Sequence, residues 1–142
     1  MAVRYDPERA PDPEQWLALG ELERIEMVRR FHRRAGIRLP NPEVHAIVHV
    51  TLENQVAMGD EIPVAATVAR LMGEGLSRHD ALHAVGSVLL QHMAALQSGE
   101  VDMEAGDPNA RYYDRLKKLT RRSWYDEFGQ GGARPSRHPD LR

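Results

Sequence analysis

The segment NPEVHAIVHVTLENQVA, residues 41–57, decides the fold class of this chain. Asn41 is a natural helix N-cap followed by a proline, and the residues after it are apolar on nearly every side of the predicted helix. A helix of this kind is largely buried. His45, His49 and Glu53 are spaced four residues apart and therefore share one face. Since unpaired imidazole and carboxylate groups are costly to bury, this polar stripe needs partners.

A second segment, SRHDALHAVG at residues 77–86, repeats the four-residue spacing with His79 and His83. His79 is expected in the first turn of a helix, where the helix dipole disfavours the imidazolium form. A neutral imidazole is the form that binds a metal. Gly86 and Ser87 follow on nearly the same face, and their small size predicts close approach of another helix.

Two histidine pairs and an in-phase glutamate predict a site for one transition metal ion. Nitrogen and oxygen ligands without sulfur suit Zn or Fe best, with Mn or Ni also compatible. The predicted ligands are His45, His49, Glu53, His79 and His83. Glu53 is either the fifth ligand or a general base beside a metal-bound water. Asn54 and Gln55 are predicted to hold the second nitrogen of an imidazole. The alternative is a buried hydrogen-bond network in which Glu53 pairs with a histidine.

The composition is that of one soluble domain. The chain has 142 residues, of which 42% are hydrophobic and 28% charged. It contains no cysteine, so disulfides, thiolate ligands and cysteine nucleophiles are excluded. No apolar stretch approaches the ~20 residues that cross a bilayer, and the first residues do not resemble a signal peptide. We therefore expect a cytoplasmic protein without a membrane partner.

Hydrophobic periodicity predicts an all-α fold, a single-domain helical bundle of about five helices. Residues 1–13 are expected to form an extended N-terminal arm, residues 14–128 a helical metal-binding domain, and residues 129–142 a disordered tail. Gly20 is a point at which the first helix could divide. The expected helices cover residues 14–35, 42–58, 63–75, 78–97 and 110–128.

Other charged and histidine side chains are weaker candidates for the site. His32 lies among arginines and is expected to be a solvated or cap-region cation. His92 is rotated away from the histidine pair of its helix and is expected at the surface, and His138 belongs to the tail. Asp80 follows Ser77 with the spacing of a capping pair. Three charged residues at helix ends either line the mouth of the site or face water, namely Arg70, Glu74 and Arg78.

The sequence from about residue 39 to 97 resembles an uncharacterised bacterial family of small helical proteins. The shared features are the NPxxHxxxH segment, the following E-x-Q and the later RHxxxH. The resemblance implies that His45, His49, Glu53 and Gln55 belong to one site, and it implies no particular activity. His79 and Asp80 are also similar to the HD pair of HD phosphohydrolases, and the histidine spacing partly matches hemerythrin-like bundles.

Charge along the chain is uneven. From Arg111 onward there are nine Lys/Arg against four Asp/Glu, although the net charge of the whole chain is −2. The acidic body and the lack of a recognisable motif argue against nucleic-acid binding. A small-molecule substrate and homo-oligomer formation are compatible with the sequence. We favour a metal-dependent enzyme, a hydrolase or lyase acting through metal-bound water. The alternative is a non-enzymatic, metal-stabilised structural or sensor module.

Overall fold

The computed structural model describes residues 4–36, 41–101 and 106–128, and these residues are mostly helical and contain no strand. The predicted all-α class is thus confirmed. The predicted tail at 129–142, with His138, lies outside the described residues. The elements are α1 (Pro13–Ala18), α2 (Glu21–Arg34), α3 (Pro42–Ala57), the short 3-10 helix η1 (Gly59–Glu61), α4 (Val64–Gly73), α5 (Arg78–Ser98), α6 (Ala110–Lys118) and α7 (Arg121–Phe128).

Side-chain caps start the helices that carry the histidine pairs. The Asn41 side chain accepts a hydrogen bond from the Val44 amide at 3.2 Å. The Ser77 hydroxyl accepts one from the Asp80 amide at 3.1 Å. Both caps agree with the predicted helix starts, and each satisfies a backbone donor that the first turn leaves without a partner. At the other end of α5, Gly99 has a φ of 80°, the left-handed conformation that commonly stops a helix.

The described residues form seven α-helices, so the predicted count of about five is wrong. Gly20 divides the first predicted helix into α1 and α2, as considered above. The last predicted helix is interrupted as well. The Thr120 amide donates to the Ser123 hydroxyl and the Ser123 amide to the Thr120 hydroxyl, each at 2.9 Å. This reciprocal cap starts α7 and ends α6 at Lys118, because hydroxyl side chains compete with the helical backbone pattern.

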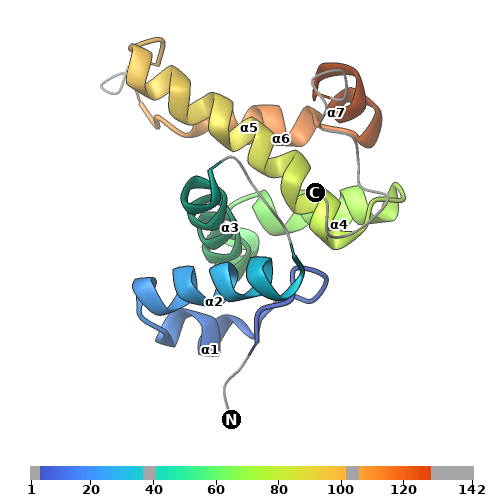
Figure 1. The fold of residues 1–142 in the computed structure, drawn as a ribbon. Coiled ribbons are helices and arrows are strands. Elements are labelled where there is room, and N and C mark those ends of the chain that lie inside the picture. Colours follow the sequence, from blue (N-terminus) through green and yellow to red (C-terminus); the bar gives the residue numbers. More distant parts are fainter. Residues whose placement is uncertain (1–3, 37–40, 102–105, 129–142) are drawn as a thin grey trace.

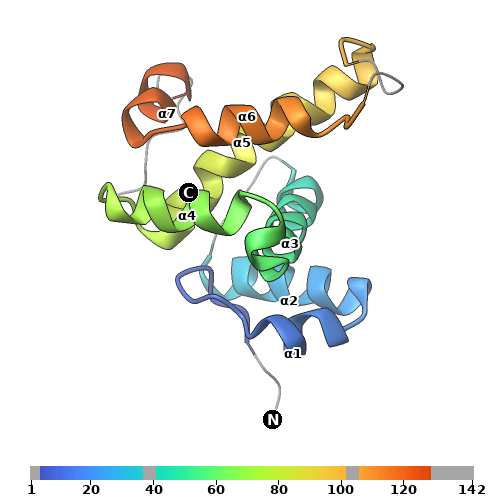
Figure 2. The same cartoon turned by 180° about the vertical axis from the view of Figure 1, so that it is seen from behind.

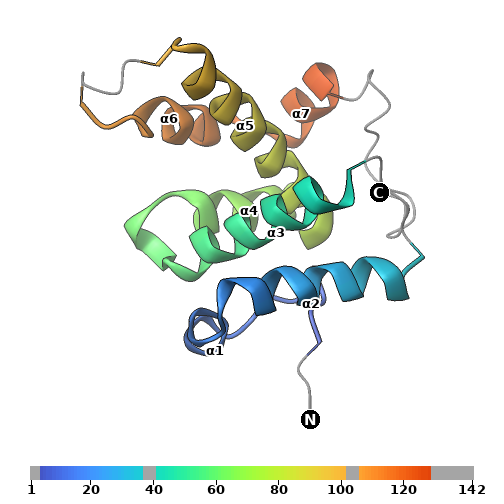
Figure 3. The same cartoon turned by 60° about the vertical axis from the view of Figure 1, so that its left-hand side comes forward.

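The helices are arranged in tiers around α3 (Figures 1 and 3). In Figure 3, α1 and α2 lie below α3 and α4, and α5, α6 and α7 lie on the other side. Helix α3 contacts α1, α2, α4 and α5. The reverse view shows α6 running along α5, with α7 next to it (Figure 2). Helix α3 is therefore the central element, as its nearly uniform apolar character predicts.

Two hydrophobic clusters lie on opposite sides of α3, so the molecule is not one simple bundle. Ala46 and Val50 pack with Tyr5, Trp16 and residues of α2 in the smaller cluster. In contrast, Leu52 packs in the larger cluster, formed with α4 to α7. The histidine pairs of α3 and α5 lie in the region between these two clusters. The polar site therefore separates the two parts of the hydrophobic core.

Helices α3 and α5 pack closely at Gly86. A Cβ atom placed on this glycine would lie 3.2 Å from Val48 Cγ1 and 3.3 Å from Leu52 Cδ1. This confirms the close approach expected at Gly86. Ser87 has a different neighbour, because its hydroxyl accepts a hydrogen bond from the Trp124 indole of α7. The absence of a side chain at Gly86 thus sets the spacing between the two helices that carry the histidine pairs.

The chain before α1 packs into the protein. Tyr5 is buried and contacts the rings of Trp16, Phe31 and His49. Arg78 of α5 donates a hydrogen bond of 2.9 Å to the Pro7 carbonyl. The described part of the predicted arm thus carries one of the residues of the core. Within the described ranges, no helix combines the length and apolar character needed to cross a membrane.

Candidate metal centre

Five imidazoles from three helices gather between α2, α3 and α5. They are His32 of α2, His45 and His49 of α3, and His79 and His83 of α5. The two rings within each α3 or α5 pair have centroids 5.1 Å and 4.5 Å apart. Across the helices, His45 and His83 are 5.2 Å apart and His49 and His79 are 5.3 Å apart. The structure thus brings together all four predicted histidine ligands.

The imidazoles form two overlapping groups that could hold a metal ion. One group is His32, His45 and His49, and the other is His49, His79 and His83. In each group the ligand atoms lie within 4.8 Å of one another. Two nitrogens bound to the same metal at ~2.1 Å are at most about 4.2 Å apart, so small side-chain movements suffice for coordination. Because His49 belongs to both groups, it is the central residue of the site.

His49 is held from behind by a chain of hydrogen bonds. The Tyr5 hydroxyl lies 3.1 Å from His49 Nδ1 and donates to Glu53 Oε2 at 2.6 Å. Glu53 in turn accepts two hydrogen bonds from the Arg78 guanidinium, at 2.7 and 2.9 Å. All of these side chains are buried, with Glu53 1% and Arg78 5% exposed. A buried carboxylate and a buried guanidinium therefore neutralise each other next to the histidines.

This arrangement selects one tautomer of His49. The tyrosine hydroxyl has one proton, and the short contact to Glu53 takes it. The Tyr5 oxygen therefore accepts the hydrogen bond from His49, which must carry its proton on Nδ1. The Nε2 lone pair then remains available, and among the described residues this buried atom has no hydrogen-bond partner. A metal ligand whose second nitrogen is fixed by a hydrogen bond is the usual arrangement in metalloproteins.

The described environment favours the neutral form of His32, His45 and His49. Burial, followed by the nearby imidazoles, holds the pKa of His49 well below 6.5. Burial, with a smaller effect of His45, lowers the pKa of His32 to about 4. Burial also lowers the pKa of His45. Neutral imidazoles can donate lone pairs to a metal without first losing a proton, so the cluster is suited to metal binding near neutral pH.

The polar residues after His49 have other partners. Glu53 lies on the predicted face, but its oxygens bind Tyr5 and Arg78, and neither histidine group includes it. The Asn54 side-chain oxygen accepts from the Trp16 indole and from Arg24, both at 2.8 Å. The Gln55 oxygen accepts from the Tyr112 hydroxyl at 2.8 Å. These amide oxygens thus join α3 to α1, α2 and α6 instead of accepting from an imidazole.

Two sequence-based expectations about single residues are wrong. His32 is not solvated, because it is 4% exposed and joins the histidine cluster. His92 is not at the surface, because it is 6% exposed and stacks on the Tyr112 ring. Of the two positions considered for Arg78, the structure excludes the one that faces water, because Arg78 is buried and pairs with Glu53. Asp80, in contrast, takes part in the N-terminal cap through its backbone amide, which donates to the Ser77 hydroxyl, and its side chain is buried.

Two residues of the site, His32 and Tyr5, were not predicted from the sequence, and only His32 had a local sequence pattern that could have indicated its burial. His32 is four residues after Val28, which is fully buried, so it extends the apolar stripe of α2. The flanking arginines concealed that signal. Tyr5 had no local signal, because its partners are 44 and 48 residues away in the sequence.

Comparison of the chain with protein-family models, with curated proteins and with solved structures found no match. The function is therefore inferred from the chemistry of the site.

Proposed function

We propose that this protein binds one transition metal ion at the histidine cluster, and that the ion joins α2, α3 and α5 as a structural or sensor module. The observation that carries the proposal is the hydrogen bond between Tyr5 and His49 Nδ1. It leaves the lone pair of Nε2 available to bind a metal ion. Both histidine groups contain His49, and since its Nδ1 is engaged by Tyr5, both would have to use Nε2. A single neutral imidazole nitrogen binds one metal, which favours one ion over two.

The proposed ligand set is His49 with neighbouring imidazoles drawn from His32, His45, His79 and His83. A set of three to five nitrogens suits Zn²⁺, and Fe²⁺ if coordination expands. In place of the ligand or base predicted from the sequence, Glu53 is proposed to orient His49 through Tyr5. A carboxylate that acts on a ligating histidine in this way raises its basicity and fixes its ring.

Elemental analysis of protein purified without a nickel resin tests this proposal. We expect about one equivalent of metal in the wild type and a large loss in His49→Ala and His83→Ala. His92→Gln is the matched control, because it removes a buried histidine outside the cluster. Circular dichroism establishes that each variant is folded. Substoichiometric metal in the wild type, or metal content unchanged in both cluster variants, contradicts the proposal.

A second candidate is a metal-dependent enzyme that acts on a small molecule, a hydrolase or lyase using metal-bound water. Two observations favour it. His45 and His83 are only partly buried, so one edge of the cluster reaches the surface. A cavity of about 490 Å³ borders Tyr5, whose hydroxyl contacts His49, and is also lined by Trp16 and Met27. Against this candidate, the predicted base Glu53 already pairs with Arg78.

The two candidates differ in whether the ion keeps an open coordination position. Cobalt-substituted protein can be titrated with azide while its visible spectrum is recorded. A saturable spectral change would show an exchangeable position and favour the enzyme. An unchanged spectrum with the full complement of cobalt bound favours the closed, structural site.

A further inference from the structure

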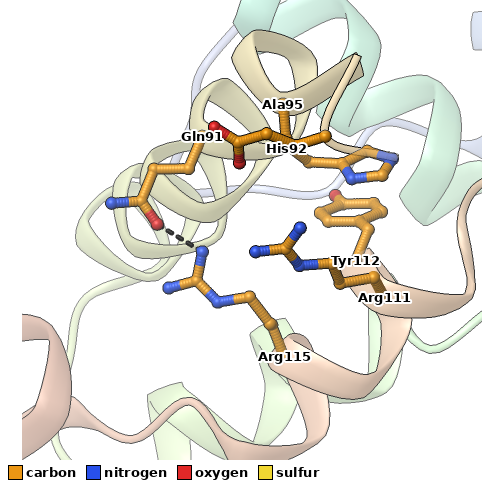
Figure 4. A pocket seen from close by; sticks show the side chains of 7 residues that line it. Gln91, His92, Ala95, Arg111, Tyr112 and Arg115 are labelled. Carbon is orange, nitrogen blue, oxygen red and sulfur yellow. Dashed lines mark hydrogen bonds between the residues drawn. The ribbon is translucent and has the colours of Figure 1, made fainter. Parts of the chain in front are cut away.

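A second pocket, separate from the histidine cluster, lies between α5 and α6 (Figure 4). Its volume is about 190 Å³, well below the roughly 300–1,000 Å³ of pockets for larger ligands. The side chains that line it include Gln91, His92, Glu100, Arg111, Tyr112 and Arg115. None of them belongs to either histidine group. The size of the pocket limits an occupant to a few non-hydrogen atoms.

One wall of this pocket is rigid. The rings of His92 and Tyr112 are stacked, with centroids 5.3 Å apart and an angle of 15° between their planes. His92 Nε2 is 3.2 Å from the Asn109 side-chain oxygen, and the Tyr112 hydroxyl donates to Gln55. Both rings are buried. The wall is therefore formed in advance, and a ligand would not have to order it.

Two guanidinium groups extend from α6 toward α5 at this pocket (Figure 4). Arg111 and Arg115 are one turn apart on α6, a spacing at which like charges repel. Arg115 is held by Gln91 and pairs with Glu127 at 3.3 Å. For Arg111, the described part of the chain provides no ion pair. One cation is thus positioned by the protein, and the other lines the same small pocket without forming an ion pair in the described part of the chain.

We propose that this pocket binds a small oxyanion, a carboxylate or phosphate group, between Arg111 and Arg115. Planar guanidinium groups bind such oxyanions with two parallel hydrogen bonds, and an anion would offset the repulsion between the two arginines. Glu100 lines the same pocket and repels a bare anion. Its carboxylate therefore favours an occupant that also has a hydrogen-bond donor, such as a hydroxycarboxylate or hydrogen phosphate.

Titration of the full chain followed by amide chemical shifts in NMR spectra tests the proposal, with three probes: lactate, propionate and inorganic phosphate. Lactate has the donor that propionate lacks, so lactate should bind more tightly. Phosphate distinguishes a phosphate ligand from a carboxylate ligand. Arg111→Gln should weaken binding about tenfold, because a charge-assisted hydrogen bond is lost at an exposed residue whose replacement leaves the fold intact. Glu100→Gln should reduce the preference for lactate over propionate.

Lys117→Gln is the matched control, because it removes an exposed positive charge from α6 that does not line the pocket. This variant should bind the probes as the wild type does. Equal weakening by Lys117→Gln and Arg111→Gln would overturn the proposal, since it would indicate general charge attraction. Shifts that do not saturate with any probe, or that do not map to the pocket, would overturn it as well. Chelation of metal should not change these affinities.

Discussion

The ion pair of Arg78 and Glu53 is buried on both sides, with side chains that are 6% and 0% exposed. Its two hydrogen bonds and the additional bonds to Tyr5 and the Pro7 carbonyl offset the cost of removing the charges from water. Removing one partner of such a pair lowers the free energy of unfolding more than replacing both partners by apolar residues, because the remaining charge is left buried and unpaired.

Glu53→Gln should lower the free energy of unfolding by about 3–5 kcal/mol, because it leaves the Arg78 charge without its counter-charge. Urea denaturation of the metal-free protein measures the change. Glu74→Gln is the control, since the Glu74–Arg70 pair is partly exposed and should cost at most about 1 kcal/mol. Equal effects of the two substitutions would mean that burial of the Arg78 pair has no energetic consequence.

Tyr5→Phe should weaken metal binding by about 10- to 100-fold, the range usual for loss of a partner behind a ligating histidine. The substitution keeps the ring in the core and removes only the hydroxyl that contacts His49 and Glu53. Competition with a chromophoric chelator gives the affinity. Tyr113→Phe provides a tyrosine control outside the site. An unchanged affinity in Tyr5→Phe would show that His49 does not need the hydroxyl to bind the ion.

At the scale of elements, the spacing between α3 and α5 decides whether their histidines can share an ion. Gly86→Ala should lower the free energy of unfolding by about 1 kcal/mol, because the cost of overpacking exceeds the gain in helix propensity. It should also weaken metal binding. Gly73→Ala in α4 is the matched control, since its added methyl group meets nothing within 4 Å. That variant should be stabilised by up to about 1 kcal/mol. Thermal denaturation with and without metal measures the stability of both variants. A higher melting temperature for Gly86→Ala would show that the close packing of α3 and α5 does not depend on this glycine.

Local signals in the sequence sufficed for most helix boundaries and failed where the structure depends on distant contacts. Asn41 and Ser77 set their helix starts through side-chain caps, which are local and therefore readable. The Thr120 cap was equally local, but it was hidden because apolar residues continue on both sides. Tyr5 and Arg78 meet Glu53 only through the tertiary fold. The histidine spacing predicted which imidazoles converge. It could not predict that Tyr5 and Arg78 form the hydrogen bonds next to His49, because these contacts have no sequence periodicity.

For the whole molecule, acid should destabilise the metal-free protein. Unfolded histidines have a pKa near 6.5, whereas in the folded protein burial lowers the pKa of His32 to about 4 and that of His49 well below 6.5. Between these values the unfolded chain binds protons that the folded chain does not, so the free energy of unfolding falls as pH falls. Each histidine kept neutral at pH 5.5 should contribute about 1.4 kcal/mol to this loss. Urea denaturation at pH 7.5 and 5.5 measures it. His32→Leu should reduce the pH dependence, and equal stability of the wild type at both pH values would contradict the prediction.

Removal of metal should lower the melting temperature at pH 7.5 if the ion joins α2, α3 and α5. With free metal at about 1,000 times the dissociation constant, the expected decrease is on the order of 10 °C. Differential scanning fluorimetry with and without chelator measures the change, and elemental analysis verifies removal. His49→Ala should show no response to chelator. A wild-type melting curve unmoved after verified removal would leave a catalytic site possible and would rule out the structural one.

The position of Tyr5 in the sequence has a consequence for biosynthesis. A ribosome makes Tyr5 before any of its partners, and His79 and His83 follow the α3 histidines after a further thirty or so residues of chain. During translation, the α2 and α3 histidines are therefore synthesised before the α5 pair, so that only part of the proposed ligand set is present at first. The hydrogen bonds from Arg78 that hold the Tyr5 segment in place come later still than His49. Completion of the metal site is thus expected late in synthesis, and the Tyr5 segment, although made before its partners, is expected to reach its final position only after Arg78 has been made.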